Sequence, residues 1–196
     1  MAEDPSLDAA LRTASFSYKN YKKGNAKGLI FMGGVGVGKT RLVSSILRDY
    51  ILRHGIPGLF KEFTRLLSEI KTGYDKGLSE SSVLEKINSV EILVIDELGK
   101  GRKTDWEITI LDSIISNRYN MRRTTLFTTN YTTKPSTTYV EPLTKTGDLT
   151  GSGKKNRGET LNQRVYSRIY SRLREMCDFV EIKAPDHRYP GGDFST

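Results

Sequence analysis

One short segment limits the possible folds of this chain more than any other, a glycine-rich turn that follows an apolar run. Residues 28–32 read GLIFM, which is typical of a strand buried on both faces. The segment from Gly33 to Thr40 reads GGVGVGKT and fits the pattern G-x-x-x-x-G-K-[ST]. Residues 41–53 then carry apolar side chains at helical spacing. This order predicts a phosphate-binding loop between a buried strand and a helix.

The residue types in this loop suit the binding of a nucleotide. Glycines let successive backbone N–H groups turn toward the phosphates, and the helix N-terminus adds partial positive charge. We expect Lys39 to reach the β and γ phosphates and the Thr40 hydroxyl to hold Mg²⁺. The predicted nucleotide-binding residues of the loop are Gly33, Gly34, Val35, Gly36, Val37, Gly38, Lys39, Thr40 and Arg41.

A second apolar segment ends in two acidic residues. The run ILVI at 92–95 is followed by Asp96 and Glu97. Asp96 is expected to complete the Mg²⁺ shell, and Glu97 to polarise a water molecule for in-line attack on the γ phosphate. Without the upstream loop, two acids at a strand end would indicate only a turn. With the loop present, a base beside the metal favours hydrolysis over transfer to a small-molecule acceptor.

Asn130 follows a β-branched segment, 124–128, that is predicted to be a strand. The ends of parallel strands meet at one crevice of a sheet. We therefore expect Asn130 to contact the γ phosphate or to orient the attacking water. By itself, an asparagine after a strand is more often a turn residue.

The rest of the chain alternates extended and helical patterns. Extended segments are predicted at 59–63, 90–95 and 179–183. Helices are predicted over 66–71 and 159–176. Two more are predicted to start at capping boxes, one near Ser82 with Glu85 and one at Thr104 with Glu107. Such alternation indicates an α/β fold with a parallel sheet covered by helices on both sides.

The pattern divides the chain into a core and three polar parts. The core spans 28–188, and a polar lead-in segment, a flexible polar insertion and a C-terminal tail are expected at 1–27, 132–160 and 189–196. Hydrophobic residues make up 36% and charged residues 28% of the chain, which excludes a disordered protein. The absence of a signal peptide, of an apolar membrane span and of any cysteine besides Cys177 predicts a cytoplasmic protein. The net charge of +8 permits a polyanionic partner without proving one.

Three arginines recur every four residues in the last predicted helix. Arg164, Arg168 and Arg172 would form one stripe along it. A solvated basic face is the simpler interpretation. The alternative is that one arginine crosses a subunit boundary to a neighbour's γ phosphate, a role that suits a planar, permanently charged guanidinium.

Together these segments resemble the AAA+ ATPase domain of the DnaC/IstB group, which contains replicative helicase loaders and transposition helper ATPases. The resemblance runs from about Lys27 to Arg188 and rests on GLIFMGGVGVGKT, ILVIDELG followed by TDWE, TTLFTTNY, and SRIYSRL with a later PDHR. It implies a P-loop NTPase fold of AAA+ type, with strand order 5-1-4-3-2, helices on both faces and little or no helical lid. It also implies that ATP and Mg²⁺ are the ligands.

The resemblance assigns roles to individual residues. Asp96 and Glu97 become the Walker B pair, and Asn130 becomes sensor 1. Arg172 becomes the preferred arginine finger, with Arg168 as the alternative. Arg188 becomes the sensor 2 arginine and is expected to touch the bound phosphates.

The resemblance also implies partners. It implies a head-to-tail homo-oligomer (a ring, spiral or filament) that acts on a replicative helicase or, alternatively, on a transposase. In related proteins a helix after the second strand faces single-stranded DNA, and the matching residues here are Arg65, Lys71, Tyr74 and Lys76. A plain surface helix is the alternative there. Because loaders usually carry an N-terminal helicase-binding region, the chain is expected to be a core fragment, to bind a helicase differently or not to bind one at all. A nucleotide-switched DNA- or protein-binding module is the second functional hypothesis.

Overall fold

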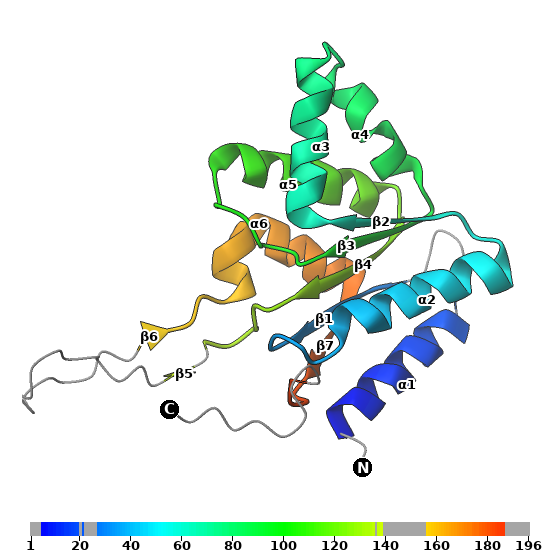
Figure 1. Ribbon diagram of the computed structural model, residues 1–196, viewed down its shortest axis with the longest axis vertical. Coiled ribbons are helices and arrows are strands. Elements are labelled where there is room, and N and C mark those ends of the chain that lie inside the picture. Colours follow the sequence, from blue (N-terminus) through cyan, green and yellow to red (C-terminus); the bar gives the residue numbers. More distant parts are fainter. Residues whose placement is uncertain (1–4, 20, 22–26, 136, 139–155, 187–196) are drawn as a thin grey trace, which may run out of the picture.

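The structure is a central parallel sheet between two layers of helices (Figure 1). The computed structural model describes residues 5–19, 21, 27–135, 137–138 and 156–186. The five strands of the sheet are β1 (Gly28–Gly33), β2 (Gly58–Glu62), β3 (Ile92–Asp96), β4 (Thr124–Thr129) and β7 (Cys177–Ile182). They lie in the order β2-β3-β4-β1-β7, and every pairing is parallel. The predicted order 5-1-4-3-2 is confirmed, with β7 as the fifth strand.

The apolar runs form the centre of the sheet. All residues of β1, β3 and β4 are buried. Strands with helices on both faces need apolar side chains on both faces, which explains the continuous runs in the sequence. The interior strands therefore end side by side at one edge, where the glycine loop, the acidic pair and Asn130 follow them.

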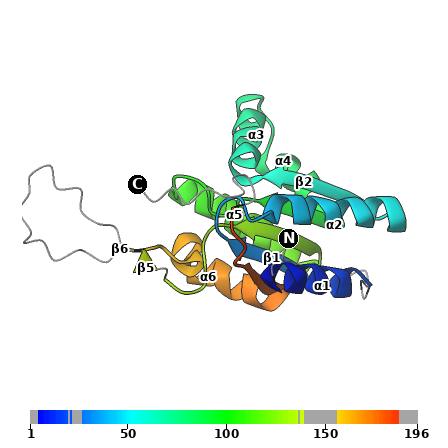
Figure 2. The same ribbon diagram turned by 60° about the horizontal axis from the view of Figure 1, so that its bottom comes forward.

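The helices divide into two groups, one for each face of the sheet. On one face, α1 (Pro5–Lys19) and α2 (Lys39–His54) pack side by side, as Figure 2 also shows. The opposite face is covered by α3 (Phe63–Asp75), α4 (Glu80–Ser89), α5 (Asp105–Asn120) and α6 (Leu161–Met176). Each group buries its own apolar cluster against the sheet.

Helix α1 was not expected from the sequence. It packs against the core through Leu7 and the fully buried Ala10. Its Ser6 hydroxyl also accepts a hydrogen bond from the Lys183 amide at 2.8 Å, next to the end of β7. The segment before β1 therefore contacts the face that carries α2.

The starts of the helices follow their capping residues. The capping box of Thr104 and Glu107 is confirmed at the start of α5. The helix predicted to begin near Ser82 is present as α4, but Ser82 and Glu85 do not cap it. Helix α4 starts after Ser79, whose hydroxyl accepts from the Ser82 amide at 3.3 Å. Helix α6 begins after Thr160, which forms a capping box with Gln163.

Helix α3 is longer than predicted and is capped by a carboxylate. Glu62, the last residue of β2, accepts hydrogen bonds from the amides of Thr64 at 3.1 Å and Arg65 at 3.0 Å. Burial by itself would raise the pKa of Glu62, but the hydrogen bonds from Thr64 and Arg65 outweigh burial and lower it. Phe63 thus belongs to the helix rather than to the preceding strand.

Parts of the predicted insertion and tail lie outside the described residues. These parts are residues 136 and 139–155 of the insertion and the tail 189–196; Arg188, at the end of the predicted core, also lies outside the described residues. The described residues nearest to 139–155 form a short antiparallel pair, β5 (Thr137–Thr138) with β6 (Asn156–Arg157). Among the helices that the structure describes, none has the length and apolar character needed to span a membrane.

Candidate nucleotide-binding site

A cavity of about 490 Å³ is lined by residues that follow β1, β3 and β4. The predicted site residues that line it are Val35, Gly36, Gly38, Lys39, Thr40, Arg41, Glu97 and Asn130. The structure therefore brings together groups from three separate parts of the sequence. Crevices at the carboxyl ends of parallel strands are the usual ligand sites of such sheets.

The glycine loop wraps around the ammonium group of Lys39. This Nζ donates to the carbonyl oxygen of Gly33 at 2.9 Å and to that of Gly34 at 2.6 Å. Gly36 and Gly38 have φ values of 77° and 92°, which residues with a side chain rarely adopt. The glycines are therefore required by the backbone path of the loop.

Asp96 is the centre of a hydrogen-bond cluster at the end of β3. The Thr40 hydroxyl, at the start of α2, lies 3.0 and 3.1 Å from its two carboxylate oxygens. The Thr128 hydroxyl, from the end of β4, donates to Oδ1 of the same carboxylate. Asp96 is 6% exposed, so these bonds form in a largely buried setting. They bring β3, β4 and α2 together at one acidic group.

The oxygen donors at Asp96 are of the kind that could hold a magnesium ion. Mg²⁺ takes oxygen ligands and is usually held by one or two protein groups together with substrate phosphates and water. The Thr40 hydroxyl and the Asp96 carboxylate are oxygen donors of this kind. Within the part of the chain that the structure describes, no group of three or more His, Cys, Asp or Glu residues is arranged to hold a metal by itself.

Glu97 lies in the cavity wall with an unusual backbone conformation. Its φ is 57°, and its amide donates to the Thr128 hydroxyl at 2.9 Å. Its carboxylate accepts a hydrogen bond from Nζ of Lys100 at 2.5 Å. That hydrogen bond and the charge of Glu97, with smaller contributions from Glu62 and Asp96, raise the pKa of Lys100. Positive φ at a non-glycine residue often marks a functional site.

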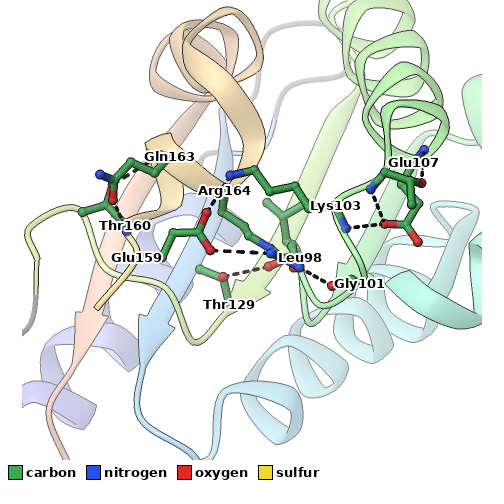
Figure 3. Close-up of polar contacts among 11 residues, drawn as sticks. Leu98, Gly101, Lys103, Glu107, Thr129, Glu159, Thr160, Gln163 and Arg164 are labelled. Atoms are coloured by element: carbon green, nitrogen blue, oxygen red, sulfur yellow. Dashed lines mark hydrogen bonds and ion pairs between the residues drawn. The ribbon is translucent and has the colours of Figure 1, made fainter. Parts of the chain in front are cut away.

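The three arginines predicted to form one stripe have two different environments. Arg172 binds Oδ1 of Asp112 on α5 at 2.9 Å, and Arg168 lies 3.6 Å from Oδ2 of the same residue. Arg164 instead points to the loop after β3, as Figure 3 shows, and donates to the carbonyl oxygens of Gly99 and Gly101. Arg168 and Arg172 do not line the cavity of their own chain.

The four candidate residues for DNA binding lie on two faces of α3. Arg65 and Lys76 line one groove, between α3 and α4. On the other side, Lys71 lies 4.6 Å from the centroid of the Trp106 ring. The Tyr74 ring packs edge-on against the same tryptophan, and its hydroxyl donates to Glu80 at 2.9 Å. The structure therefore does not place these four side chains on one surface.

Sequence reasoning missed three residues that hold the site together, Thr128, Lys100 and Arg164. Thr128 lies on the strand next to the acidic pair, so the predicted strand order was a signal that could have found it. Lys100 and Arg164 act through the conformation of the loop after β3. In the sequence, only the two glycines that flank Lys100, Gly99 and Gly101, indicate an unusual loop conformation there.

This fold and this site define a P-loop NTPase of the AAA+ type. The chain belongs to the family of IstB-like ATP-binding proteins, whose model matches residues 5–140. It is 32% identical over 108 residues to the replicative helicase loader DnaC of Escherichia coli (strain K12), which covers 55% of this chain and 44% of that protein. It is 31% identical over 114 residues to DnaC of Buchnera aphidicola subsp. Acyrthosiphon pisum, covering 57% and 46%. The match thus spans less than half the length of these relatives.

Solved structures agree with this assignment. The crystal structure of the DnaC helicase loader superposes with a TM-score of 0.72 at 28% identity, and the alignment covers 93% of each chain. The crystal structure of DnaI gives a TM-score of 0.68 at 22% identity, covering 96% of this chain and 87% of that one. AMPPCP-bound DnaA from Aquifex aeolicus gives 0.67 at 14% identity, covering 93% and 48%. The last two likenesses show the shared fold alone.

Proposed function

We propose that this chain is a Mg²⁺-dependent AAA+ ATPase that hydrolyses ATP between the subunits of a head-to-tail homo-oligomer and assists DNA replication as a helicase loader does. The observation that carries the proposal is the contact of the Thr40 hydroxyl with both carboxylate oxygens of Asp96. This contact joins the glycine loop to the acidic pair beside a cavity that also contains Lys39 and Glu97.

The role of each group follows from its position. Lys39 and the backbone N–H groups of the loop would neutralise and orient the β and γ phosphates. Glu97 would orient the attacking water and accept its proton, and Asn130 would bind that water or a γ phosphate oxygen. Thr40 and Asp96 would hold Mg²⁺, which when bound supplies positive charge to the phosphate oxygens.

An arginine from a neighbouring subunit would complete the site. Arg172 is the proposed finger and Arg168 the alternative, because both lie outside the cavity of their own chain. Their side chains differ in freedom, since that of Arg168 is 73% exposed and that of Arg172 is 25% exposed. A guanidinium suits this role because it stays charged and binds phosphate oxygens through a planar fork. Arg188 is proposed to touch the phosphates and lies outside the described residues.

The dependence of turnover on protein concentration tests the shared site. Phosphate release from Mg-ATP is measured per subunit over a range of protein concentrations. We expect the activity per subunit to rise with concentration and Arg172→Ala or Arg168→Ala to abolish the rise. Arg174→Ala is the matched control, because Arg174 is an exposed arginine of the same helix that lies over Phe179. An activity per subunit that stays flat and is unaffected by either finger variant would contradict the proposal.

The partner is proposed from the relatives. The curated relatives are named replicative helicase loaders, so a replicative helicase is the first candidate. The match to the IstB-like family makes a transposase the alternative. Sizing the chain with a purified helicase or a purified transposase, with and without a non-hydrolysable ATP analogue, separates the two. Nucleotide-dependent co-elution with one of them identifies the partner class.

A nucleotide-switched binding module is the second candidate function. One observation favours it: Arg172, the proposed finger, is paired with Asp112 of its own chain. This pair would exchange when a neighbouring subunit binds. The variant Glu97→Gln discriminates between the two functions. If it still assembles with nucleotide and supports the partner's activity, binding is the output and hydrolysis only resets it.

Single-stranded DNA is proposed as a further ligand, at the α3–α4 groove with Arg65 and Lys76. Retention of a labelled oligonucleotide should depend on ATP and weaken as salt rises. Lys76→Ala should lower it, while Lys71→Ala, on the opposite side of α3, serves as the comparison. Equal binding by both variants and the unmodified chain would exclude this surface.

A further inference from the structure

One guanidinium from α6, that of Arg164, binds two backbone carbonyls of the loop after β3. Arg164 donates through Nε to the carbonyl oxygen of Gly99 at 2.5 Å and through Nη2 to that of Gly101. These two carbonyls flank Lys100, so the bonds fix the backbone on both sides of it. The Arg164 side chain is only 13% exposed. In this setting each hydrogen bond from a charged donor is stronger than it would be in water.

The surroundings of Arg164 restrict its position further. Its guanidinium lies 5.4 Å from the centroid of the Tyr131 ring, and Tyr131 lines the nucleotide cavity. Glu159 pairs with Arg164 at 3.5 Å and accepts a hydrogen bond from Lys103 at 2.6 Å, and Figure 3 shows Glu159 between the two basic side chains. A side chain at Gly99 would lie 2.8 Å from Cγ of Arg164. The close approach of helix and loop therefore requires glycine there.

Lys100 connects this fixed loop to Glu97, the proposed base. Its Nζ binds Oε2 of Glu97 at 2.5 Å, and its amide donates to the Glu97 carbonyl oxygen at 2.9 Å. Glu97 itself is held from the other side by the Thr128 hydroxyl. Both Glu97 and Lys100 line the cavity. The carboxylate that would orient the attacking water is thus placed by a lysine whose own backbone is fixed by α6.

We propose that Arg164 and Lys100 are positioning residues that together set the orientation of the Glu97 carboxylate for hydrolysis. This inference rests on the proposed ATPase function and adds to it a role for α6 within its own subunit. Arg164 acts through the backbone on either side of Lys100, and Lys100 acts through its ion pair with Glu97. Neither residue is assigned to binding of the nucleotide.

The expected kinetic signature follows from these separate tasks. Lys100→Met frees the carboxylate of Glu97, and Arg164→Met frees the loop that carries Lys100. Each variant should lower kcat by about tenfold or more, as expected when a catalytic group loses its fixed geometry. The affinity for a fluorescent ATP analogue should change by less than about threefold, because the glycine loop is untouched. The double variant should be no slower than the slower single variant, because both changes act through Glu97.

A second measurement does not depend on activity. Amide hydrogen exchange of residues 97–101 should accelerate in Arg164→Met, while exchange in the glycine loop stays as in the unmodified chain. Arg164→Lys should recover only part of the effect, because an ammonium lacks the fork that reaches two carbonyls. Arg174→Met on α6 and Lys86→Met on α4 are matched controls, since both residues are exposed and lie outside the cavity lining.

The outcomes separate this inference from the proposed function. If phosphate release by the unmodified chain persists in Lys39→Ala, the ATPase proposal fails, whatever Arg164 does. If Lys39→Ala abolishes release but Arg164→Met and Lys100→Met leave kcat unchanged, only the present inference is overturned. An increase of kcat in Lys100→Met, or additive losses in the double variant, would also overturn it. Because Lys100 is exposed, its variant tests the inference even if Arg164→Met unfolds.

Discussion

Replacing Thr128 by valine tests the hydrogen bonds that hold the two acidic residues in place. The Thr128 side chain is buried, and its hydroxyl makes two bonds at once, accepting from the Glu97 amide at 2.9 Å and donating to Asp96. Valine has almost the same shape but can neither accept nor donate. The substitution therefore removes both bonds with little change in packing.

The loss can be estimated from these two bonds. A hydrogen bond to a charged group contributes about 1.5–3 kcal/mol, and a buried N–H group left without an acceptor costs about 1–3 kcal/mol. The two losses share one oxygen and are not fully additive, so we expect Thr128→Val to lower the free energy of unfolding by about 2–4 kcal/mol. Thr128→Ser keeps the hydroxyl and loses one methyl group, which costs about 1 kcal/mol.

Urea unfolding of the nucleotide-free chain measures these differences. Thr72→Val is the matched control, because Thr72 is exposed on α3 and bonds only within its own helix, so a change within about 0.5 kcal/mol is expected. The same variants are then assayed for phosphate release, where Thr128→Val should be at least about tenfold slower than Thr128→Ser. If valine costs no more than serine in either assay, the hydroxyl does not hold Asp96 and Glu97.

Three further predictions concern other parts of the fold. Glu62→Gln should lower the free energy of unfolding by about 1 kcal/mol at neutral pH, because α3 loses its cap. Since the pKa of Glu62 is lowered in the folded chain, this difference from the unmodified chain should disappear as pH falls through that pKa. Urea unfolding at several pH values measures it. Arg118→Met should lower the free energy of unfolding by about 3–5 kcal/mol in thermal unfolding, because it removes the donor to the carbonyls of Ile87, Val90 and Thr124, which lie at the end of α4, just before β3 and at the start of β4. Gly36→Ala should weaken binding of an ATP analogue more than Gly38→Ala, because only at Gly36 would the new methyl meet Asp186; Asp186→Ala should recover that difference in a titration.

The sheet could be predicted because its central strands have a simple physical requirement. A strand covered on both faces needs a continuous apolar run, and such runs stand at β1 and β3. Short connections and parallel pairing then bring the polar residues after each strand to one edge. This requirement predicts that the loop at Gly33, the acids at Asp96 and the amide at Asn130 lie at one edge, whereas the loop itself is recognised from its G-x-x-x-x-G-K-[ST] pattern. Their roles in catalysis remain predictions for the assays above.

Helix α1 and the cap of α4 were not predicted correctly, because the sequence signal was weak for the first and ambiguous for the second. Helix α1 packs on the core through few apolar residues, Leu7 and the small Ala10 among them, so its apolar face is hard to recognise. The sequence at the start of α4 has three serines within four residues, Ser79, Ser81 and Ser82, as possible caps. The left-handed turn at Gly77, with φ of 76°, ends the preceding segment, and the helix then starts at the first serine that follows, Ser79. A cap rule applied to single residues cannot choose among neighbouring serines.

The arginine stripe shows a different reason for failure, because a periodicity argument assumes one continuous helix. Tyr166 interrupts α6 with φ of 61° and ψ of 153°, a conformation that is strained for any residue other than glycine. The turn before the interruption carries Arg164 and faces the loop after β3, whereas the turns after it carry Arg168 and Arg172 and face Asp112. Equal spacing in sequence therefore does not give one shared face here. Such strain costs of the order of 1–3 kcal/mol and persists only where the surrounding contacts hold it. The bonds of Arg164 to the loop are contacts of this kind. The interruption at Tyr166, which the periodicity argument did not anticipate, therefore lets one helix contact both the Glu97 loop and the proposed subunit boundary.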